Sequence, residues 1–243
     1  MSIEVPFTKE NLDYYLKELA KEYKKRSHGT PAELILVGGA SVIINYEFRM
    51  SSYDIDTAYD ARSVMKEAIN AVGDRLGLPN VWVNDDFKKT SSYTPKIAQY
   101  SEYYKTFSNV LQIRTIRAEY LVAMKLMSAR RYKKDTSDIA GIFYEQQIAG
   151  NPMTYDKVNT AVNQLYGGWD NISEYAKELL QKALECKDLK QLFIEFSADE
   201  MEAKAALLDV ERRSPGTVQK DTIDSIIEVA KKRKMMKHDI DER

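Results

Sequence analysis

Two glycines and two aspartates are the residues of this sequence best suited to phosphate and metal chemistry. Gly38 and Gly39 end an apolar run, and Asp54 and Asp56 stand further along in the order Asp-Ile-Asp. Glycines at a strand-to-helix turn let backbone N–H groups approach an anion, and a helix N-terminus favours negative charge. Two carboxylates on one face of a strand suit Mg²⁺, which prefers one or two carboxylates plus substrate phosphates. Together the turn and the acids predict a nucleoside triphosphate site.

Each of these motifs taken alone has a plainer interpretation. A Gly-Gly pair can be only a tight turn, and Asp-x-Asp can be the solvated edge of a strand. The sequence contains neither the P-loop pattern that ends in Gly-Lys-Ser/Thr nor the Gly-x-Gly-x-x-Gly pattern. A kinase or NTPase of the P-loop kind is therefore disfavoured.

The composition limits the class of protein further. The 243 residues are 44% hydrophobic, which is enough for a core, and their formal net charge of −1 gives no global attraction to nucleic acid or membrane. The single cysteine, Cys186, excludes an internal disulfide framework and a cysteine-based metal cluster. No signal peptide or membrane-spanning run is recognisable, so we expect a cytoplasmic protein with no membrane partner.

The apolar periodicity changes along the chain and predicts two parts. Helical spacing over residues 12–23, with Thr8 as the cap, precedes a strand that ends at the glycines. The remaining elements of the first part are a helix at 40–48, a strand at 53–59, a helix at 61–77, two strands at 102–116 around Ser108-Asn109, and helices at 117–131 and 135–148. After Pro152 only helices are predicted, at 154–166, 171–185, 189–213 and 221–237. We therefore expect one domain over residues 1–150 and a helical domain over residues 151–243.

The ordered set of motifs resembles the DNA polymerase β-like nucleotidyltransferase superfamily. The matching segments are the glycine pair after an apolar strand, "RMSSYDID" and "EYLVAMKLMSARRYKKDTSDI", which together cover residues 34–148. Within the superfamily they are similar to the AbiEii toxins of type IV toxin-antitoxin systems and to uncharacterised relatives. The resemblance implies an α+β fold with a mixed sheet flanked by helices, followed here by the helical C-terminal domain.

The resemblance also implies roles for individual residues. Gly38 and Gly39 would bind the triphosphate, and Asp54 and Asp56 would bind Mg²⁺ or Mn²⁺. Many members have Ser where Gly39 stands, so Ser41 is the candidate for the missing hydroxyl. The remaining matches to the nucleotide-binding and catalytic positions are Arg49 and Ser51 before the acids, Lys125, and both Asp135 and Asp138, which compete for one later position.

Active members of the superfamily commonly have a third carboxylate on a later strand, where it helps a metal to activate the attacking hydroxyl. The corresponding strand here offers Gln112 and Arg114 in place of an acid. The general base is therefore unassigned, and the candidate substitutes are Asp85, Asp86, Asp135 and Asp138.

Lys125 and two basic runs have alternative interpretations. Lys125 lies in a mostly apolar helical segment, from which it could extend to solvent or contact a phosphate. The run Arg130, Arg131, Lys133, Lys134 and the run at residues 231–237 could attract a polyphosphate or an RNA end, or could be solvated helix ends.

Two hypotheses of different class follow. The first is a Mg²⁺-dependent nucleotidyltransferase that transfers an NMP from an NTP to a hydroxyl of an RNA (tRNA-like) or protein acceptor, as the toxin of a toxin-antitoxin or phage-defence system with a cognate antitoxin. The second is a noncatalytic NTP-binding or interaction protein that retains the fold.

Overall fold

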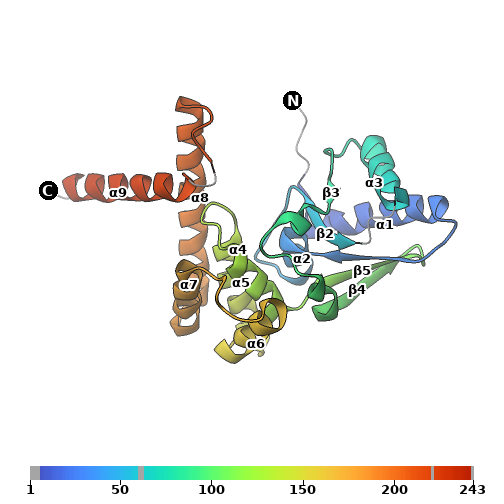
Figure 1. The fold of residues 1–243 in the computed structure, drawn as a ribbon, viewed down its shortest axis with the longest axis horizontal. Helices are drawn as coiled ribbons and strands as arrows, with labels where there is room; N and C mark the ends of the chain where they lie inside the picture. Colours follow the sequence, from blue (N-terminus) through green and yellow to red (C-terminus); the bar gives the residue numbers. More distant parts are fainter. Residues whose placement is uncertain (1–5, 60–62, 220–221, 242–243) are drawn as a thin grey trace.

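The computed structural model describes residues 6–59, 63–219 and 222–241, with side chains to residue 232 in the last range and without that of Tyr59. Its architecture is α+β, as predicted from the sequence. A mixed sheet with three helices lies at one end of the molecule, and helices α4 to α9 lie at the other (Figure 1). Two predicted helices begin at residues 61 and 221, and these two residues lie outside the described ranges.

The sheet has five strands in the order β3-β2-β1-β5-β4. β1 pairs antiparallel with β2 and parallel with β5, so it lies at the centre. The strands are β1 (Ala32–Leu36), β2 (Ile55–Tyr59), β3 (Val83–Asn84), β4 (Ser101–Phe107) and β5 (Leu111–Ile116). Ser108 and Asn109 both have positive φ, 53° and 55°, as expected for the two-residue hairpin turn between β4 and β5.

Alternation along the strands gives the sheet two different faces. Leu34 and Leu36 pack with the apolar faces of α1 (Lys9–Arg26) and α3 (Ser63–Leu76) in one buried cluster. Ile35 points the other way and joins a second cluster with the helices that follow the sheet. The second face also carries Asp56, because Asp56 and Ala58 alternate with buried Ile55 and Thr57.

The helices after the sheet are α4 (Ala118–Ser128), α5 (Asp135–Ile148), α6 (Tyr155–Tyr166), α7 (Glu174–Glu185), α8 (Leu189–Arg213) and α9 (Ile223–Asp241). Side chains of Thr154, Ser173 and Asp188 accept backbone N–H groups at the starts of α6, α7 and α8, which satisfies donors that a helix end leaves open. α4 is buried nearly all round, and the apolar cluster that contains it runs from Ile35 to Phe196. The division into domains at residue 150 stays a prediction.

Three local features differ from the prediction. α2 (Gly38–Asn45) begins at the glycines, so both belong to its first turn, and β2 begins at Ile55, so Asp54 precedes the strand. Strand β3 and the 3₁₀ turns η1 (Asp86–Lys89) and η2 (Pro95–Tyr100) were not predicted. Among the described residues, no helix combines the length and apolarity that crossing a bilayer requires.

The segment after α2 is held against α5 by a close contact between Phe48 and Gly141. A Cβ at Gly141 would lie 2.6 Å from the ring of Phe48. We expect Gly141→Ala to lower the free energy of unfolding by about 1–2 kcal/mol, since overpacking costs about 1–3 kcal/mol and helix propensity returns up to about 1. Urea denaturation checks the value. In a Phe48→Ala background the cost should disappear, and an equal cost in both backgrounds would contradict this contact as the cause.

Candidate active site

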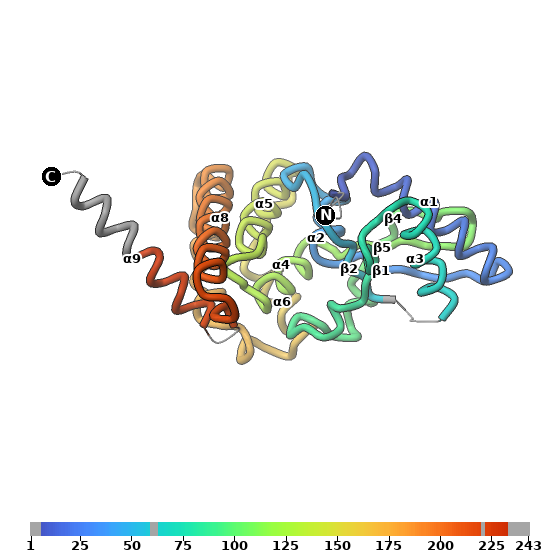
Figure 2. The backbone as a smooth tube through the Cα atoms, turned by 90° about the horizontal axis from the view of Figure 1, so that it is seen from above, coloured from blue at the N-terminus to red at the C-terminus, as the bar shows by residue number. Residues whose placement is uncertain are grey.

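β1 enters α2 next to β2 at one end of the sheet (Figure 2), and the glycine turn and the aspartate pair belong to this junction. Val37 N–H donates to the carbonyl of Asp56 at 3.0 Å, which sets β2 beside the turn. Gly38 has a φ of +54°, and a Cβ there would lie 3.1 Å from Oδ2 of Asp56. Glycine is therefore required both by the backbone conformation and by the carboxylate beside it.

The second glycine lies against a different group of side chains. A Cβ at Gly39 would lie 2.6 Å from Ser52 Oγ and 2.7 Å from a terminal nitrogen of Arg49. Ser52 in turn donates to Asp54 at 3.3 Å. The N-terminus of α2 thus has a guanidinium on one side and a carboxylate pair on the other, which is an arrangement suited to a phosphate chain and its metal.

Asp54 lies close enough to Asp56 to affect its charge. Asp54 is exposed, whereas Asp56 is partly buried in β2 and faces Asn84 of β3. Burial, followed by the charge of Asp54, raises the pKa of Asp56 to about 6, although Lys125 and a hydrogen bond from Asn84 oppose the shift. Two carboxylates that repel each other in this way are stabilised when a cation binds between them.

The aspartate pair fits the needs of Mg²⁺ when substrate supplies other ligands. Among residues 6–59, 63–219 and 222–241, no group of three or more His, Cys, Asp or Glu side chains is arranged to hold a metal ion. Mg²⁺ does not require such a cage, because it commonly keeps several waters and takes one or two carboxylates plus substrate phosphates. Asp54 and Asp56 offer two such carboxylates.

A buried network of ion pairs lies beside the acids and joins α4, α5 and the segment before β2. The ammonium of Lys125 lies 2.7 Å from Asp138 and 3.0 Å from Asp135. Arg49 donates to the same carboxylate of Asp138, and Arg130 Nε donates to Asp135 at 2.8 Å. Three cations therefore face two carboxylates, and Lys125 and Arg130 also act on the charge of Asp56.

The charges in this network are fixed by their partners. Burial works to lower the pKa of Lys125, but the carboxylates of Asp138 and Asp135 outweigh it and raise the pKa. Burial likewise works to raise the pKa of Asp135, and the cations Lys125 and Arg130 lower it to about 2. Lys125 is only 7% exposed, so the interpretation in which it extends to solvent is wrong.

Several candidates from the sequence have their polar groups engaged in other contacts. Ser41 is fully buried, and its hydroxyl accepts the backbone N–H of Ile116 at 3.1 Å. Ser51 meets Arg49 through its backbone carbonyl. Asp85 pairs with Lys88, and Asp86 pairs with Lys89.

The basic runs form ion pairs with the C-terminal helices. Arg131 pairs with Glu228, and Lys231 pairs with Asp199. The side chains of residues 233–237 lie outside the described ones.

The strand register explains the missing third carboxylate. In the β1–β2 ladder Leu36 stands opposite Thr57, so Val37 is level with Asp56. In the β1–β5 ladder Ile35 stands opposite Arg114, which places Ile116 level with Val37. A fully buried isoleucine therefore occupies the place on β5 that is level with Asp56 across β1, and Gln112 and Arg114 lie further along the strand.

The sequence did not identify Glu200 of α8. Its buried carboxylate accepts the backbone N–H and the hydroxyl of both Thr136 and Ser137. These donors form the first turn of α5, so Glu200 holds the helix end that carries Asp135 and Asp138. The sequence did contain a feature that could have indicated a buried role for Glu200. This glutamate lies at helical spacing within the apolar stripe of α8, which is formed by Leu192, Phe196, Ala203 and Leu207.

The fold and the site define the class of protein, which is an α+β protein with a glycine turn and an aspartate pair at one end of its sheet. The family described as "Nucleotidyltransferase of unknown function (DUF6036)" matches residues 14–166, well over half of the chain. The chain belongs to this family. No curated protein and no solved structure matches it.

The first prediction for the site concerns Lys125. Lys125→Met keeps much of the stem but leaves Asp135 and Asp138 buried with one cation fewer, so we expect it to lower the free energy of unfolding by about 3 kcal/mol or more. Urea denaturation followed by circular dichroism measures this. Lys17→Met, at an exposed lysine of α1, is the matched control and should change stability by about 0.5 kcal/mol or less. Equal losses in the two variants would contradict a stabilising role for the network.

The second prediction concerns Glu200, whose pKa burial raises from 4.5 to about 7. Because the folded protein binds this proton more tightly than the unfolded chain, the resulting stabilisation is complete below about pH 4.5 and is lost as the pH rises through 7. Glu200→Gln cannot titrate. The stability of the parent minus that of Glu200→Gln should therefore fall by up to roughly 3 kcal/mol between pH 4.5 and 8. A difference that is constant over this range in urea titrations would show that the pKa is not raised.

Proposed function

We propose that this protein is a Mg²⁺- or Mn²⁺-dependent nucleotidyltransferase that transfers an NMP from an NTP to an acceptor hydroxyl and releases pyrophosphate. The observation that carries the proposal is the contact between the glycine turn and the aspartate pair, in which Gly38 lies directly against the carboxylate of Asp56. The family to which the chain belongs supports the same reaction class.

The proposal assigns a task to each side chain around the turn. The first N–H groups of α2 and the guanidinium of Arg49 bind the β- and γ-phosphates, because both lie at Gly39. Asp54 and Asp56 hold the metal. A bound Mg²⁺ would neutralise charge on the transferring phosphate and align it with the attacking oxygen. Lys125 and Arg130 contribute positive potential at Asp56.

Asp135 and Asp138 act through the cations that they hold. Each carboxylate pairs with two cations, and the pKa of Asp135, lowered to about 2 against the effect of burial by Lys125 and Arg130, makes its carboxylate a weak proton acceptor. We therefore assign both residues to positioning Lys125, Arg49 and Arg130, and not to removing the proton of the acceptor. Asp135 and Asp138 were alternative matches to one acidic position of the superfamily. Since both contact Lys125, we assign this role to the two residues together.

The finer parts of the proposal are the acceptor, the biological setting and the compartment. We propose an RNA acceptor and an AbiEii-like toxin role with a cognate antitoxin, in the cytoplasm. The resemblance of residues 34–148 to that toxin group supports them. Incubating the protein with each α-labelled NTP, Mg²⁺ and either total RNA or protein extract, and then identifying the labelled species, tests the reaction and the acceptor together. NTP binding without any labelled product would favour the alternative, a noncatalytic NTP-binding protein.

Asp56→Asn is the sharpest test of the metal site. The variant loses a metal ligand, so we expect labelled transfer to fall at least about a hundredfold, as is typical when an electrostatic group of the transition state is removed. Stability should be unchanged or slightly higher, because the repulsion from Asp54 is removed. Asp74→Asn, at an exposed aspartate of α3, is the matched control and should retain full transfer. Full transfer by folded Asp56→Asn would overturn the assignment.

A further inference from the structure

A cavity of about 660 Å³ is lined in part by residues on the same face of the sheet as Asp56, and Tyr23 and Met65, from the cluster on the opposite face, also line it. Ala58 lines the cavity, and it follows Asp56 by two residues on the same face of β2. Ile35 of β1 stands opposite Ala58 and forms part of the floor. β2 leads away from the glycine turn, so the cavity lies on the far side of Asp56 from the N-terminus of α2.

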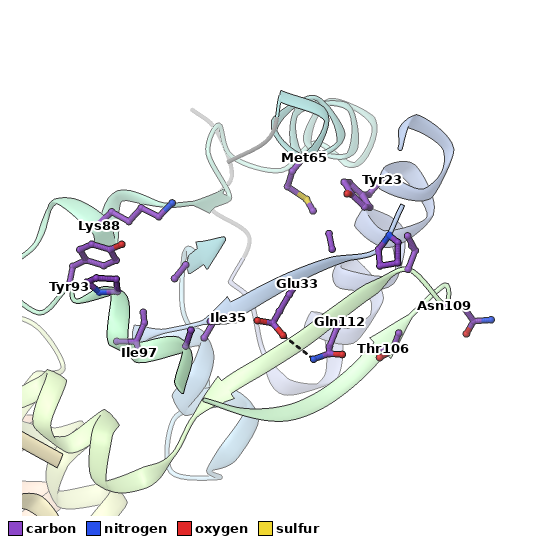
Figure 3. Close-up of a pocket in the computed structure, with 16 residues that line it drawn as sticks. Tyr23, Glu33, Ile35, Met65, Lys88, Tyr93, Ile97, Thr106, Asn109 and Gln112 are labelled. Atoms are coloured by element: carbon purple, nitrogen blue, oxygen red, sulfur yellow. Dashed lines mark hydrogen bonds between the residues drawn. The ribbon is translucent and has the colours of Figure 1, made fainter. Parts of the chain in front are cut away.

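The lining of the cavity suits an uncharged planar group. Ile35, Ile97 and Ala58 provide apolar surface, and Tyr93 provides an aromatic ring. Glu33 and Gln112 lie side by side on β1 and β5, and the amide of Gln112 donates to the carboxylate of Glu33 at 3.0 Å (Figure 3). This pair offers hydrogen-bonding groups next to an apolar surface, as ligand sites commonly do.

The same lining does not suit a triphosphate. Glu33 and Lys88 are the charged side chains among the residues that line the cavity, and Lys88 pairs with Asp85. The cations that suit phosphates are instead Arg49, which lies at Gly39, and Lys125 and Arg130, whose charges act on Asp56, and none of the three lines the cavity. The cavity and the glycine turn therefore differ in the chemistry that they can bind.

The geometry of phosphoryl transfer separates the two substrates in the same way. The attacking and leaving oxygens lie roughly in line on opposite sides of the transferred phosphorus. If pyrophosphate leaves toward the glycine turn, the acceptor hydroxyl must approach from the opposite side of the aspartate pair. That side leads to the cavity.

We propose that this cavity is the acceptor pocket and binds the terminal nucleobase of a single-stranded RNA. The inference rests on the proposed function, because it uses the position of the triphosphate. The base packs on Ile35 and against Tyr93, and its amino or ring N–H groups donate to Glu33. The NTP does not enter the pocket, and the phosphates of the RNA stay outside it.

Binding can be measured without any turnover by NMR of isoleucine methyl groups. The probes are single-stranded RNA trinucleotides without a 5′-phosphate, added to the full chain. We expect saturable shifts of Ile35 and Ile97, and none of Ile172 or Ile227, which lie in the helical part. No shift of Ile35 and Ile97 at millimolar trinucleotide, or equal shifts with NTP and Mg²⁺ alone, would overturn the proposal.

Ala58→Trp fills the pocket, and Tyr103→Trp on β4 is the matched control, because Tyr103 is 59% exposed and does not line the cavity. We expect Ala58→Trp to lose trinucleotide binding and transfer to RNA while its affinity for NTP stays within about twofold of the parent value. Glu33→Gln, at an exposed position, should weaken trinucleotide binding about tenfold, which is about 1.4 kcal/mol, even if Ala58→Trp does not fold.

These outcomes separate the pocket from the proposed function. Trinucleotide binding by a parent protein that transfers nothing would support the pocket and contradict the transferase. Transfer to RNA that survives both Ala58→Trp and Glu33→Gln would support the transferase and overturn the pocket. Transfer to protein with no trinucleotide binding would also overturn it.

Discussion

The ion pairs of Lys125 are the interaction on which the site depends. Lys125 is buried in α4, and its ammonium is satisfied by two carboxylates that both come from the first turn of α5. A buried charge without such partners would cost several kcal/mol, so α4 and α5 cannot shift apart without exposing or stranding it. Through Asp138 the same network fixes Arg49, and Arg49 lies against the first turn of α2. The first turn of α2, where we propose that the phosphates bind, is thereby tied to the helices that follow the sheet.

Glu200 extends this dependence beyond the region that the family covers. The matched residues end at 166, whereas Glu200 lies on α8 and closes the first turn of α5 from outside. It is a buried carboxylate next to Asp138, whose charge contributes to the raised pKa of Glu200. The donors from Thr136 and Ser137 compensate the burial of this group. The C-terminal helices therefore have a structural task at the site.

Local patterns in the sequence were enough to predict most of the fold, and the reasons for the failures are physical. Helices and long strands repeat an apolar period, so they were found, whereas β3 has two residues and shows no period. Asp54 was predicted to lie in a strand because the alternation of polar and apolar residues continues before Ile55, where the backbone pairing of β2 begins. The burial of Lys125 could not be deduced from its own helix. The acids that permit it lie ten and thirteen residues further along the chain, in the first turn of α5.

The isoleucine that stands in place of a third carboxylate changes where the acceptor can lose its proton. Ile116 is fully buried and level with Asp56 across β1, so β5 presents no acid at this position of the sheet. Asp135 and Asp138 are neutralised by their cations. Among the ion pairs of the described residues, none involves Asp54 or Asp56, and both remain available to a metal. A transferase built in this way relies on positioning and on charge stabilisation, which supply most of the rate in phosphoryl transfer, and less on a strong base. In the proposed transferase the demand for specificity falls on how the acceptor is held, which is the task that we propose for the cavity beyond Asp56.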